Sequence, residues 1–537
     1  MEDTDVIVFW GSNAREAHPI FFHHALKGIR AGARCFVVDP RRTGTAEWAE
    51  GHLPLRVGTD IELAHTIARE IIHGGMVHED FVRNATEGFE EFRAHVEPWT
   101  LERGEAVTGV PAALIRRLAH ALGKADRAQI CWTLGITEHH NGVDNVLSLI
   151  NLALLRGHVG RQGAGLNPLR GQNNVQGGGD MGALPHKLPG FQDVEDDEIR
   201  GRYEALWGVK VPAKKGWHLT EMFEAMRSEE LKSLFVIGEN PAQSEADVGH
   251  TRKLLTTRDI MVVSDIFMTR TAELADVVFP ASASWVESDG TVTNSERRVQ
   301  RCRKALDPPG EARDDIWILA ELSRRLGRDW GHPTPRELWE EMRSLSPLHG
   351  GMSWERLGQA DGIQWPCPTE GHPGSVVLHD RLWAQPRQGR AAPFSCTVGE
   401  GPVDELTPEF PMRLTTGRRL DEYNTGVQTG QYKNPMRRRE TVELCLADIV
   451  ALGVADGETV RVSSRRGSVL ALVRADERLT PGLAFMTYHD PDDIDTNLLT
   501  IEATDPKAGT AEFKATAIRV EPLGAHGHPA DPHPAHV

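Results

Sequence analysis

Short apolar runs that end in polar turns recur along the chain, and helical segments separate them. In the first part, strands are expected over 6–10, 35–39, a short segment ending near Leu55, and 128–134, with helices over 18–31, 61–72 and 112–122. Either Thr59 or Asp60 is expected to cap the helix over 61–72. Strands that alternate with helices in this way predict a parallel sheet covered by helices on both faces.

The same pattern returns after residue 171 and changes twice further along. Strands are expected over 234–237, 260–265 and 277–280, helices over 314–326 and 335–342, and short strands with glycine turns over 412–415, 459–462 and 468–473. The predicted fold class is α/β, with two doubly wound nucleotide-binding-like α/β domains and a C-terminal β-barrel domain. The predicted boundaries are 1–170 and 171–300 for the two α/β domains, 301–400 for a Trp-, Pro- and Gly-rich connecting region, 401–523 for the barrel and 524–537 for a disordered tail.

Composition is that of a soluble globular protein with several domains. Of the 537 residues, 39% are hydrophobic and 26% are charged, and 60 basic against 77 acidic residues give a net charge of −17. Nucleic acid requires a basic surface, so the charge excludes it as a main partner. No apolar run is long enough for a direct membrane span, and no signal peptide is recognised, which favours a cytoplasmic protein.

The six cysteines are far apart in the sequence, at Cys35, Cys131, Cys302, Cys367, Cys396 and Cys445. No Cys-x-x-Cys pair occurs, so the sequence contains neither an iron–sulfur motif nor a structural zinc motif, and no metal ligand is predicted. Isolated cysteines of this kind are typical of small buried side chains in a reducing compartment.

One segment is rich in amides and glycines and has almost nothing to bury. Residues 167–182 read Asn-Pro-Leu-Arg-Gly-Gln-Asn-Asn-Val-Gln-Gly-Gly-Gly-Asp-Met-Gly, with Arg170 as the one basic residue. Glycines allow close approach of the backbone, amides offer paired donors and acceptors, and a guanidinium suits a carboxylate or phosphate. A long surface loop is the alternative interpretation. At another polar turn, at most one of His139 and His140 can face a pocket, and packing or surface roles are favoured for both.

The order Arg-Gly-Gln-Asn-Asn-Val-Gln-Gly, followed by Asp-Met-Gly, resembles the active-site loop of molybdenum- or tungsten-dependent formate dehydrogenases in the molybdopterin oxidoreductase superfamily. The resemblance runs over essentially the whole chain. It also rests on Gly-Ser-Asn-Ala at 11–14 with His-Pro at 18–19, Asp-Pro-Arg at 39–41, Gly-Ile-Thr at 135–137, Asp-Ile-Phe-Met-Thr at 265–269, Thr-Thr-Gly-Arg at 415–418 and Asn-Leu-Leu-Thr at 497–500. It implies molybdenum or tungsten bound through two molybdopterin guanine dinucleotides (bis-MGD), one on each α/β domain, with the barrel closing over both.

The resemblance also assigns site residues by motif. One guanine dinucleotide is expected on Gly11, Asn13, Asp39, Thr59 and Asp60, with Gly135 also binding cofactor, and the other on Gly238, Asn240, Ser264, Asp265 and Thr269. From the barrel, Arg418, Asn497 and Lys514 are expected to contact pterin or phosphate. Arg170 matches the arginine that orients the substrate, and Gln172 lies nearby on pterin or substrate. The implied reaction converts formate into CO2, two electrons and a proton.

One departure from the family pattern is large. The family carries an N-terminal module with a 4Fe–4S cluster site, followed by the cysteine or selenocysteine that ligates the metal and an adjacent histidine, and none of the six cysteines stands in a matching motif. The cluster and the metal ligand are therefore expected in a module that this sequence lacks. Three interpretations are open: a truncated reading frame, a split enzyme with a separate iron–sulfur/metal-ligand chain beside its electron-transfer subunits, and a non-catalytic scaffold in an electron-transfer complex. A fourth changes only the substrate, to nitrate or another oxyanion. Arg170 and its loop favour catalysis on formate.

Overall fold

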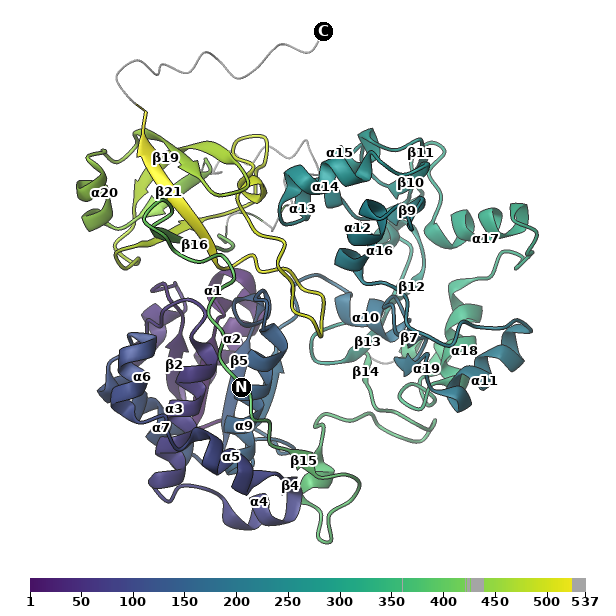
Figure 1. Cartoon of the computed structure of the whole chain (residues 1–537). Helices are drawn as coiled ribbons and strands as arrows, with labels where there is room; N and C mark the ends of the chain where they lie inside the picture. Colours follow the sequence, from purple (N-terminus) through teal and green to yellow (C-terminus); the bar gives the residue numbers. More distant parts are fainter. Residues whose placement is uncertain (360, 421, 423–424, 426–438, 524–537) are drawn as a thin grey trace.

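The protein is described here by a computed structural model that covers residues 1–359, 361–420, 422, 425 and 439–523. The tail predicted over 524–537 lies outside the described residues. The described elements form two α/β units, a mixed region that follows the second unit, and a C-terminal barrel (Figure 1).

The first unit is built on a five-stranded parallel sheet in the order β3-β2-β1-β5-β6. Alternate residues of a strand point to opposite faces. Accordingly, Phe9 of β1 packs in one core with Phe22, whereas Val8 and Trp10 belong to a second core with Leu63. Helices therefore cover both faces of this sheet, as the sequence predicts. The elements are β1 (Val6–Trp10), β2 (Arg34–Val38), β3 (Gly51–Leu53), β5 (Ala128–Trp132), β6 (Gly165–Pro168), α2 (Pro19–Arg30), α3 (Asp60–His73), α7 (Ala112–Lys124) and α9 (Gly142–Arg156).

The first turn of α3 lacks the side-chain cap that the sequence suggests. Thr59 occupies the N-cap position, but its hydroxyl donates to the Arg56 carbonyl at 2.7 Å and caps no helical amide. The Asp60 carboxylate instead accepts a hydrogen bond from the Trp10 indole at 2.8 Å. The capping prediction was wrong because both oxygens have partners outside the helix that sequence spacing does not reveal.

The second unit contains a three-stranded parallel sheet in the order β11-β10-β9. Its strands β9 (Ser233–Ile237), β10 (Ile260–Asp265) and β11 (Val277–Pro280) lie where strands are predicted. On one face, Val236 and Met261 form a core with α12 (Leu219–Arg227) and α14 (Val248–Leu255). The other face is more open, since Ile237 is 39% and Val277 41% exposed.

The next region returns the chain to the first unit. This region contains a small antiparallel sheet of β12 (Gly290–Thr293), β13 (Arg298–Cys302) and β14 (Ile363–Gln364). Between β13 and β14 the chain forms the helices α17 (Asp315–Arg325), α18 (Pro335–Leu345) and α19 (Trp354–Gln359). Then β15 (Ala392–Pro393) pairs with β4 (Thr86–Glu87) of the first unit. Just beyond, the Asn151 amide exchanges two hydrogen bonds with the Ser395 backbone, at 2.8 and 3.0 Å.

The C-terminal strands close into a barrel, which confirms the predicted architecture. They are β16 (Met412–Thr416), β17 (Thr441–Leu444), β18 (Thr459–Ser463), β19 (Ser468–Ala475), β20 (Leu483–Met486) and β21 (Thr516–Pro522), bonded in the order β16-β20-β17-β19-β18-β21. Leu414, Val442 and Val460 are fully buried in its interior.

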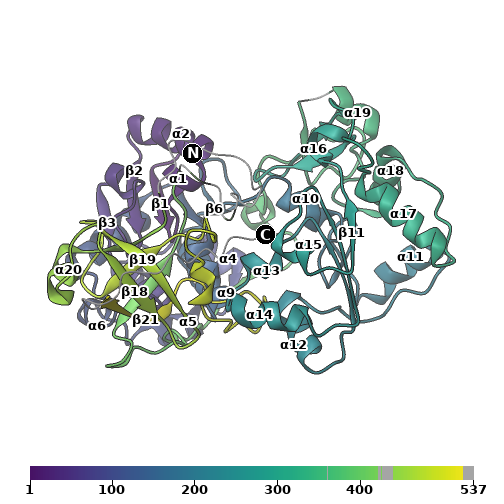
Figure 2. The ribbon, with the colours of Figure 1, turned by 90° about the horizontal axis from the view of Figure 1, so that it is seen from above.

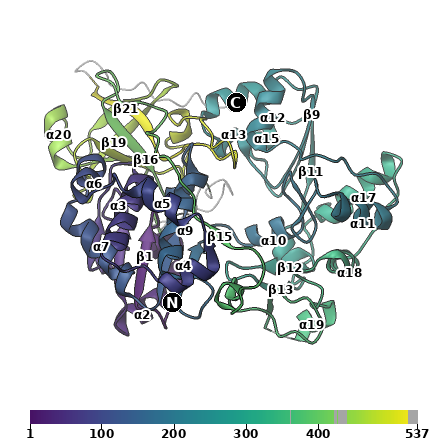
Figure 3. The same cartoon turned by 60° about the horizontal axis from the view of Figure 1, so that its bottom comes forward.

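The units are arranged in two groups (Figures 2 and 3). The first unit and the barrel lie together, the second unit and α17 to α19 form the other group, and α10 (Val175–Asp180) lies on the inner side of that group.

The remaining elements are short helices and strands between those already described. They are α1 (Ala14–Ala17), α4 (Glu79–Ala85), α5 (Phe89–Val96), α6 (Leu101–Thr108), α8 (Leu134–Thr137), β7 (Lys187–Leu188), β8 (Gln192–Asp193), α11 (Asp197–Trp207), α13 (Pro241–Ser244), α15 (Arg270–Glu273), α16 (Ser284–Glu287) and α20 (Leu446–Leu452). Within the described ranges, none of the helices has both the length and the apolar character needed to cross a bilayer.

Candidate active site

A cavity lies where the carboxyl ends of β1, β2 and β5 meet the barrel and residues 167–182, here called the Arg170 loop. Ligands of open parallel sheets bind at such carboxyl ends. The sequence-predicted residues that line it are Gly11, Asn13, Asp39, Asp60, Gly135, Gln172, Arg418 and Lys514. Thr59 does not line the cavity, although its neighbours Gly58 and Asp60 do.

Two turns in the cavity wall require glycine for geometric reasons. Gly11 has a φ of +55°, and a Cβ there would lie 2.7 Å from the carbonyl carbon of Gly135. A Cβ at Gly135 would in turn lie 2.5 Å from the Gly11 oxygen. Next to this contact, the Asn13 Oδ1 accepts the Thr45 hydroxyl at 3.0 Å, while its buried Nδ2 has no partner among the described residues. The cavity lining therefore includes a residue with an unused buried donor.

A buried cation from the barrel forms another part of the wall. Lys514 is 6% exposed, donates to the Thr416 carbonyl at 3.1 Å and pairs with the Glu138 carboxylate at 2.8 Å. Burial alone would lower the pKa of Lys514, but the Glu138 charge outweighs it and the pKa is raised. Burial raises the pKa of Tyr488, which lines the same wall. At neutral pH Lys514 is thus charged and Tyr488 protonated.

Two carboxyl groups share the cavity with these cations. Burial raises the pKa of Asp39 to about 6, against the opposing effects of the Arg41 backbone amide and the Arg41 charge. Burial also raises the pKa of Asp60. Carboxylates can accept the donors of a base or ribose, whereas the cations Arg41, Arg418 and Lys514 suit phosphate. The wall therefore offers partners to both ends of a nucleotide.

Arg170 lies at the edge of this cavity, and its guanidinium is not paired with any of the described residues. Its chain neighbours Leu169 and Gly171 line the cavity, and its carbonyl accepts a hydrogen bond from His18 Nε2 at 2.6 Å. Its side chain is exposed, and across the described part of the chain the guanidinium makes no hydrogen bond or ion pair. Because a guanidinium is permanently charged, it is available to an anionic ligand.

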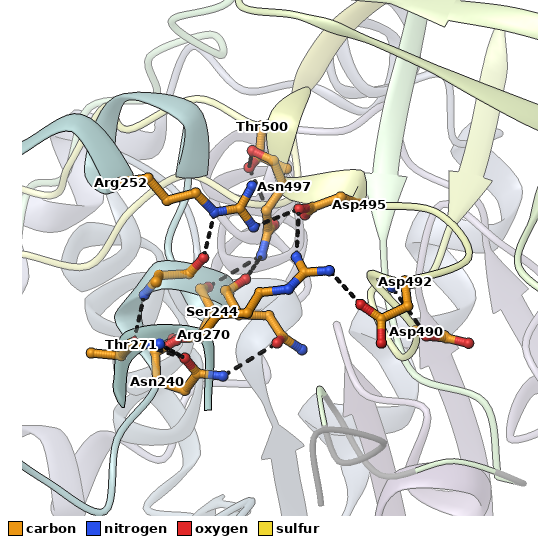
Figure 4. A network of polar contacts seen from close by, with 12 residues as sticks. Asn240, Ser244, Arg252, Arg270, Thr271, Asp490, Asp492, Asp495, Asn497 and Thr500 are labelled. Carbon is orange, nitrogen blue, oxygen red and sulfur yellow. Dashed lines mark hydrogen bonds and ion pairs between the residues drawn. The ribbon is translucent and has the colours of Figure 1, made fainter. Parts of the chain in front are cut away.

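The second predicted group lies at the carboxyl edge of β9 and β10, and Figure 4 shows one of its members, Asn240. Its polar atoms organise the local turns. The Gly238 amide donates to the Ser264 carbonyl at 2.9 Å, the Asn240 Oδ1 accepts the Thr271 hydroxyl at 2.7 Å, and the Thr269 hydroxyl accepts the Ala272 amide at 3.2 Å. The Asp265 Oδ1 accepts the Ile266 amide at 2.7 Å, and burial raises the pKa of Asp265.

The barrel contacts this edge through a polar network (Figure 4). Arg252 and Arg270 of the second unit pair with Asp495 of the barrel at 2.7 and 3.1 Å. The Asn497 amide donates to the carbonyls of Gln243 and Ser244, both at 3.2 Å. Asn497 is 2% exposed and joins two units through these bonds, and its contact with pterin stays a prediction.

Comparison with known proteins agrees with this geometry. Residues 1–325 match the molybdopterin oxidoreductase family, and residues 412–517 match the molydopterin dinucleotide binding domain. The chain belongs to the molybdopterin oxidoreductase family. It is 42% identical to F420-dependent formate dehydrogenase 2 subunit alpha of Methanococcus maripaludis over 97% of this chain and 77% of that protein. It is 36% identical to formate dehydrogenase H of Escherichia coli over 97% of this chain and 73% of that protein.

A solved structure shares the fold. Acetylene hydratase from Pelobacter acetylenicus superposes with a TM-score of 0.73 at 21% identity, covering 97% of this chain and 78% of that one. At this identity the likeness concerns the fold alone. It agrees with the predicted fold class of two α/β units and a barrel.

The cavity residues fit a molybdopterin dinucleotide of the kind this family binds. The unused Asn13 Nδ2 supplies a donor, and Arg418 with Lys514 supplies charge from the matched barrel segment. No cluster of three or more His, Cys, Asp or Glu side chains with metal-binding geometry occurs in the part of the chain that the structure describes.

Several cavity residues were not assigned from the sequence. His18, Arg41 and His139 line the cavity, and Glu138 pairs with its buried lysine. His139 is 3% exposed, in keeping with the favoured packing role, and it also lines the cavity just beyond the end of α8. His140 faces away, with its Nδ1 3.0 Å from Glu512. The His18 and Arg41 motifs were noted, but spacing did not show which of their side chains turn inward.

Replacing Asp39 with asparagine is expected to stabilise the cofactor-free chain at neutral and higher pH. Asparagine keeps the oxygen that accepts the Arg41 amide at 3.0 Å and removes the buried charge. The pKa of Asp39 rises from 3.8 to about 6 on folding, so the folded chain holds the proton more tightly and the unfolding free energy of the natural chain falls as pH rises through this window. The expected gain is about 3 kcal/mol near pH 8, and it vanishes below about pH 4.

Urea unfolding at these two pH values measures the difference. Asp456→Asn is the matched control, because its exposed carboxylate accepts the Ala475 amide at 2.7 Å without lining the cavity. A stabilisation of Asp39→Asn that is equal at both pH values would show that charge burial is not its cause.

Proposed function

We propose that this chain is the catalytic alpha subunit of a formate dehydrogenase and oxidises formate to CO2. The observation that carries the proposal is the uncommitted guanidinium of Arg170, on a glycine- and amide-rich loop beside the cofactor cavity. A scaffold protein has no use for an unpaired cation held at such a cavity. Relatives whose names describe formate dehydrogenase alpha subunits, at 37–42% identity, support the same function.

In this proposal the chain would hold molybdenum or tungsten through two molybdopterin guanine dinucleotides, and this centre would supply the acceptor for the two electrons of formate. Gly11, Asn13, Asp39, Asp60 and Gly135, with Thr59 behind them, hold one dinucleotide. The edge formed by Gly238, Asn240, Ser264, Asp265 and Thr269 holds the other. Arg418 and Lys514 neutralise phosphate from the barrel side, and Asn497 braces the barrel on the second edge.

The role of Arg170 is orientation. A bidentate guanidinium binds both oxygens of a carboxylate and so fixes the direction of the C–H bond, which is an entropic contribution to rate. Gln172 lies two residues further along the same cavity wall and offers an amide donor to the same carboxylate or to pterin. The electrons then leave through partner subunits, in keeping with relatives that are named as alpha subunits.

The test is catalysis by the chain purified together with its native partner subunits. Formate-dependent reduction of a viologen dye is expected, with about two guanine nucleotides released per chain on acid hydrolysis, as one per α/β unit requires. Nitrate is the competing substrate. Nitrate reduction without formate oxidation would replace the proposed substrate, and absence of guanine nucleotide would remove the cofactor assignment.

A further inference from the structure

The Arg170 loop is anchored at its beginning by the first unit. The His18 Nε2–H donates to the Arg170 carbonyl at 2.6 Å, and the Leu169 amide donates to the Trp132 carbonyl of β5 at 2.9 Å. His18 stands at the junction of α1 and α2 and is followed by Pro19 at the first helical position. Proline restricts the backbone at this junction, so the His18 imidazole is attached to a segment with little conformational freedom.

The other end of the loop is anchored by the connecting region. Asp180 is 2% exposed, and its Oδ2 accepts the Trp365 indole N–H at 3.0 Å while its Oδ1 accepts the Gln176 amide at 3.2 Å. The fully buried His349 has its Nε2 3.7 Å from Asp180 Oδ2. Nearer the arginine, the Asn174 Oδ1 accepts the Thr293 amide at 2.9 Å.

Between these anchors the loop buries almost nothing. Gly171, Gln172 and Asn173, which lie between Arg170 and α10, are exposed, and Gly171 gives the backbone little intrinsic stiffness. The position of an uncommitted guanidinium on such a segment is therefore set by hydrogen bonds at its two ends and not by packing around it.

We propose that His18 and Trp365 are positioning residues that together fix the Arg170 guanidinium toward its anionic substrate, one from each side of the loop. The proposal rests on the proposed function for the identity of the substrate, formate. Neither residue needs to touch formate, since both act through the loop backbone or through Asp180. A displacement of about 1 Å at a reacting group can cost about 100-fold in rate.

The experiment uses the holoenzyme and its native partners. His18→Phe keeps a ring but removes the donor, His18→Gln restores a donor at the position of Nε2, and Trp365→Phe keeps an aromatic ring but removes the indole N–H and part of the ring volume. Each phenylalanine variant is expected to lower kcat/KM for formate about 10-fold or more, with kcat falling and KM rising, and His18→Gln to recover most of the loss. In the double variant His18→Phe/Trp365→Phe, the loss in kcat/KM is expected to differ by more than about 2-fold from the product of the two single losses, because both residues act on one loop.

Matched controls break the same kinds of bond elsewhere. His95 donates to the Thr397 carbonyl at 2.7 Å and Trp383 to the Val159 carbonyl at 2.7 Å, both away from the loop. His95→Phe and Trp383→Phe are expected to leave formate kinetics within about 2-fold.

A second readout does not depend on turnover. Amide hydrogen exchange over 169–182 in the holoenzyme is expected to accelerate in His18→Phe and Trp365→Phe and to stay unchanged in the controls, with guanine nucleotide content equal to that of the natural protein. Unchanged exchange, a loss of activity that parallels loss of nucleotide, or a purely multiplicative double variant would each overturn the proposal. If the natural holoenzyme fails to oxidise formate, the proposed function fails, and the exchange experiment still decides whether these residues fix the loop.

Discussion

Arg170→Lys is expected to lower kcat/KM for formate by about 100-fold, and Arg170→Ala by about 1000-fold, in the assembled enzyme. Lysine keeps the charge but replaces a planar fork with a point charge, so it can attract the carboxylate without fixing its direction. The lysine variant should therefore show a marked loss in kcat beside a raised KM. The alanine variant loses both attraction and orientation. Steady-state kinetics with a dye acceptor measure the two parameters.

Stability and cofactor content should not change in these variants, because the Arg170 guanidinium has no hydrogen bond or ion pair among the described residues. Arg161→Lys is the matched control, since its guanidinium pairs with Asp126 at 3.2 Å on the outside of the first unit. Unaltered kinetics in Arg170→Lys would remove this residue from the substrate site. Lost cofactor would instead give Arg170 a role in cofactor binding.

The first half of the candidate site was predictable from local sequence. Gly11 and Gly135 follow strands whose burial pattern is clear, and turns after parallel strands meet at one sheet edge. The polar residues beside them thus had to lie together once the sheet order was fixed. Lys514 is different: it comes from the end of the chain, and its place in the same cavity follows from barrel closure, which local pattern does not specify.

The second unit shows where pattern reasoning reaches its limit. All three strands lie as predicted, because they contain unbroken apolar runs such as 260–263. Such a run predicts burial on both faces of a parallel sheet. Ile237 and Val277 are nevertheless about two-fifths exposed, because the helices that form the core with this sheet lie on one face. Which helix covers which face is a tertiary property that strand composition does not contain.

The hydrogen-bond and ion-pair partners of the polar side chains could not be predicted from the sequence either. His18 stands 152 positions from Arg170, and Glu138 stands 376 positions from Lys514. No periodicity links such positions. The family resemblance marked the lysine and the arginine, whereas the residues that hold them in place became evident only from the distances.

Lys514→Met is expected to lower both the free energy of unfolding and the cofactor content, with the largest combined effect of the substitutions proposed. Methionine matches the shape of the lysine stem and removes the charge, which leaves the Glu138 carboxylate buried without its partner at 2.8 Å. Breaking one side of a buried ion pair costs about 3–5 kcal/mol. The cavity also loses a cation that we propose binds phosphate, and a charge-assisted bond of that kind contributes about 1.5–3 kcal/mol, or about 10- to 100-fold in affinity.

The double variant Lys514→Met/Glu138→Gln separates these two roles. Neutralising Glu138 removes the unpaired charge, so urea unfolding of the double variant should recover most of the lost stability. Guanine nucleotide content should stay low, because the phosphate partner is still absent. Lys507→Met is the matched control, since Lys507 lies on the same segment but pairs with Asp144 outside the cavity. If stability and nucleotide content recover together in the double variant, Lys514 serves only to neutralise Glu138 and the cofactor phosphate is bound by other residues.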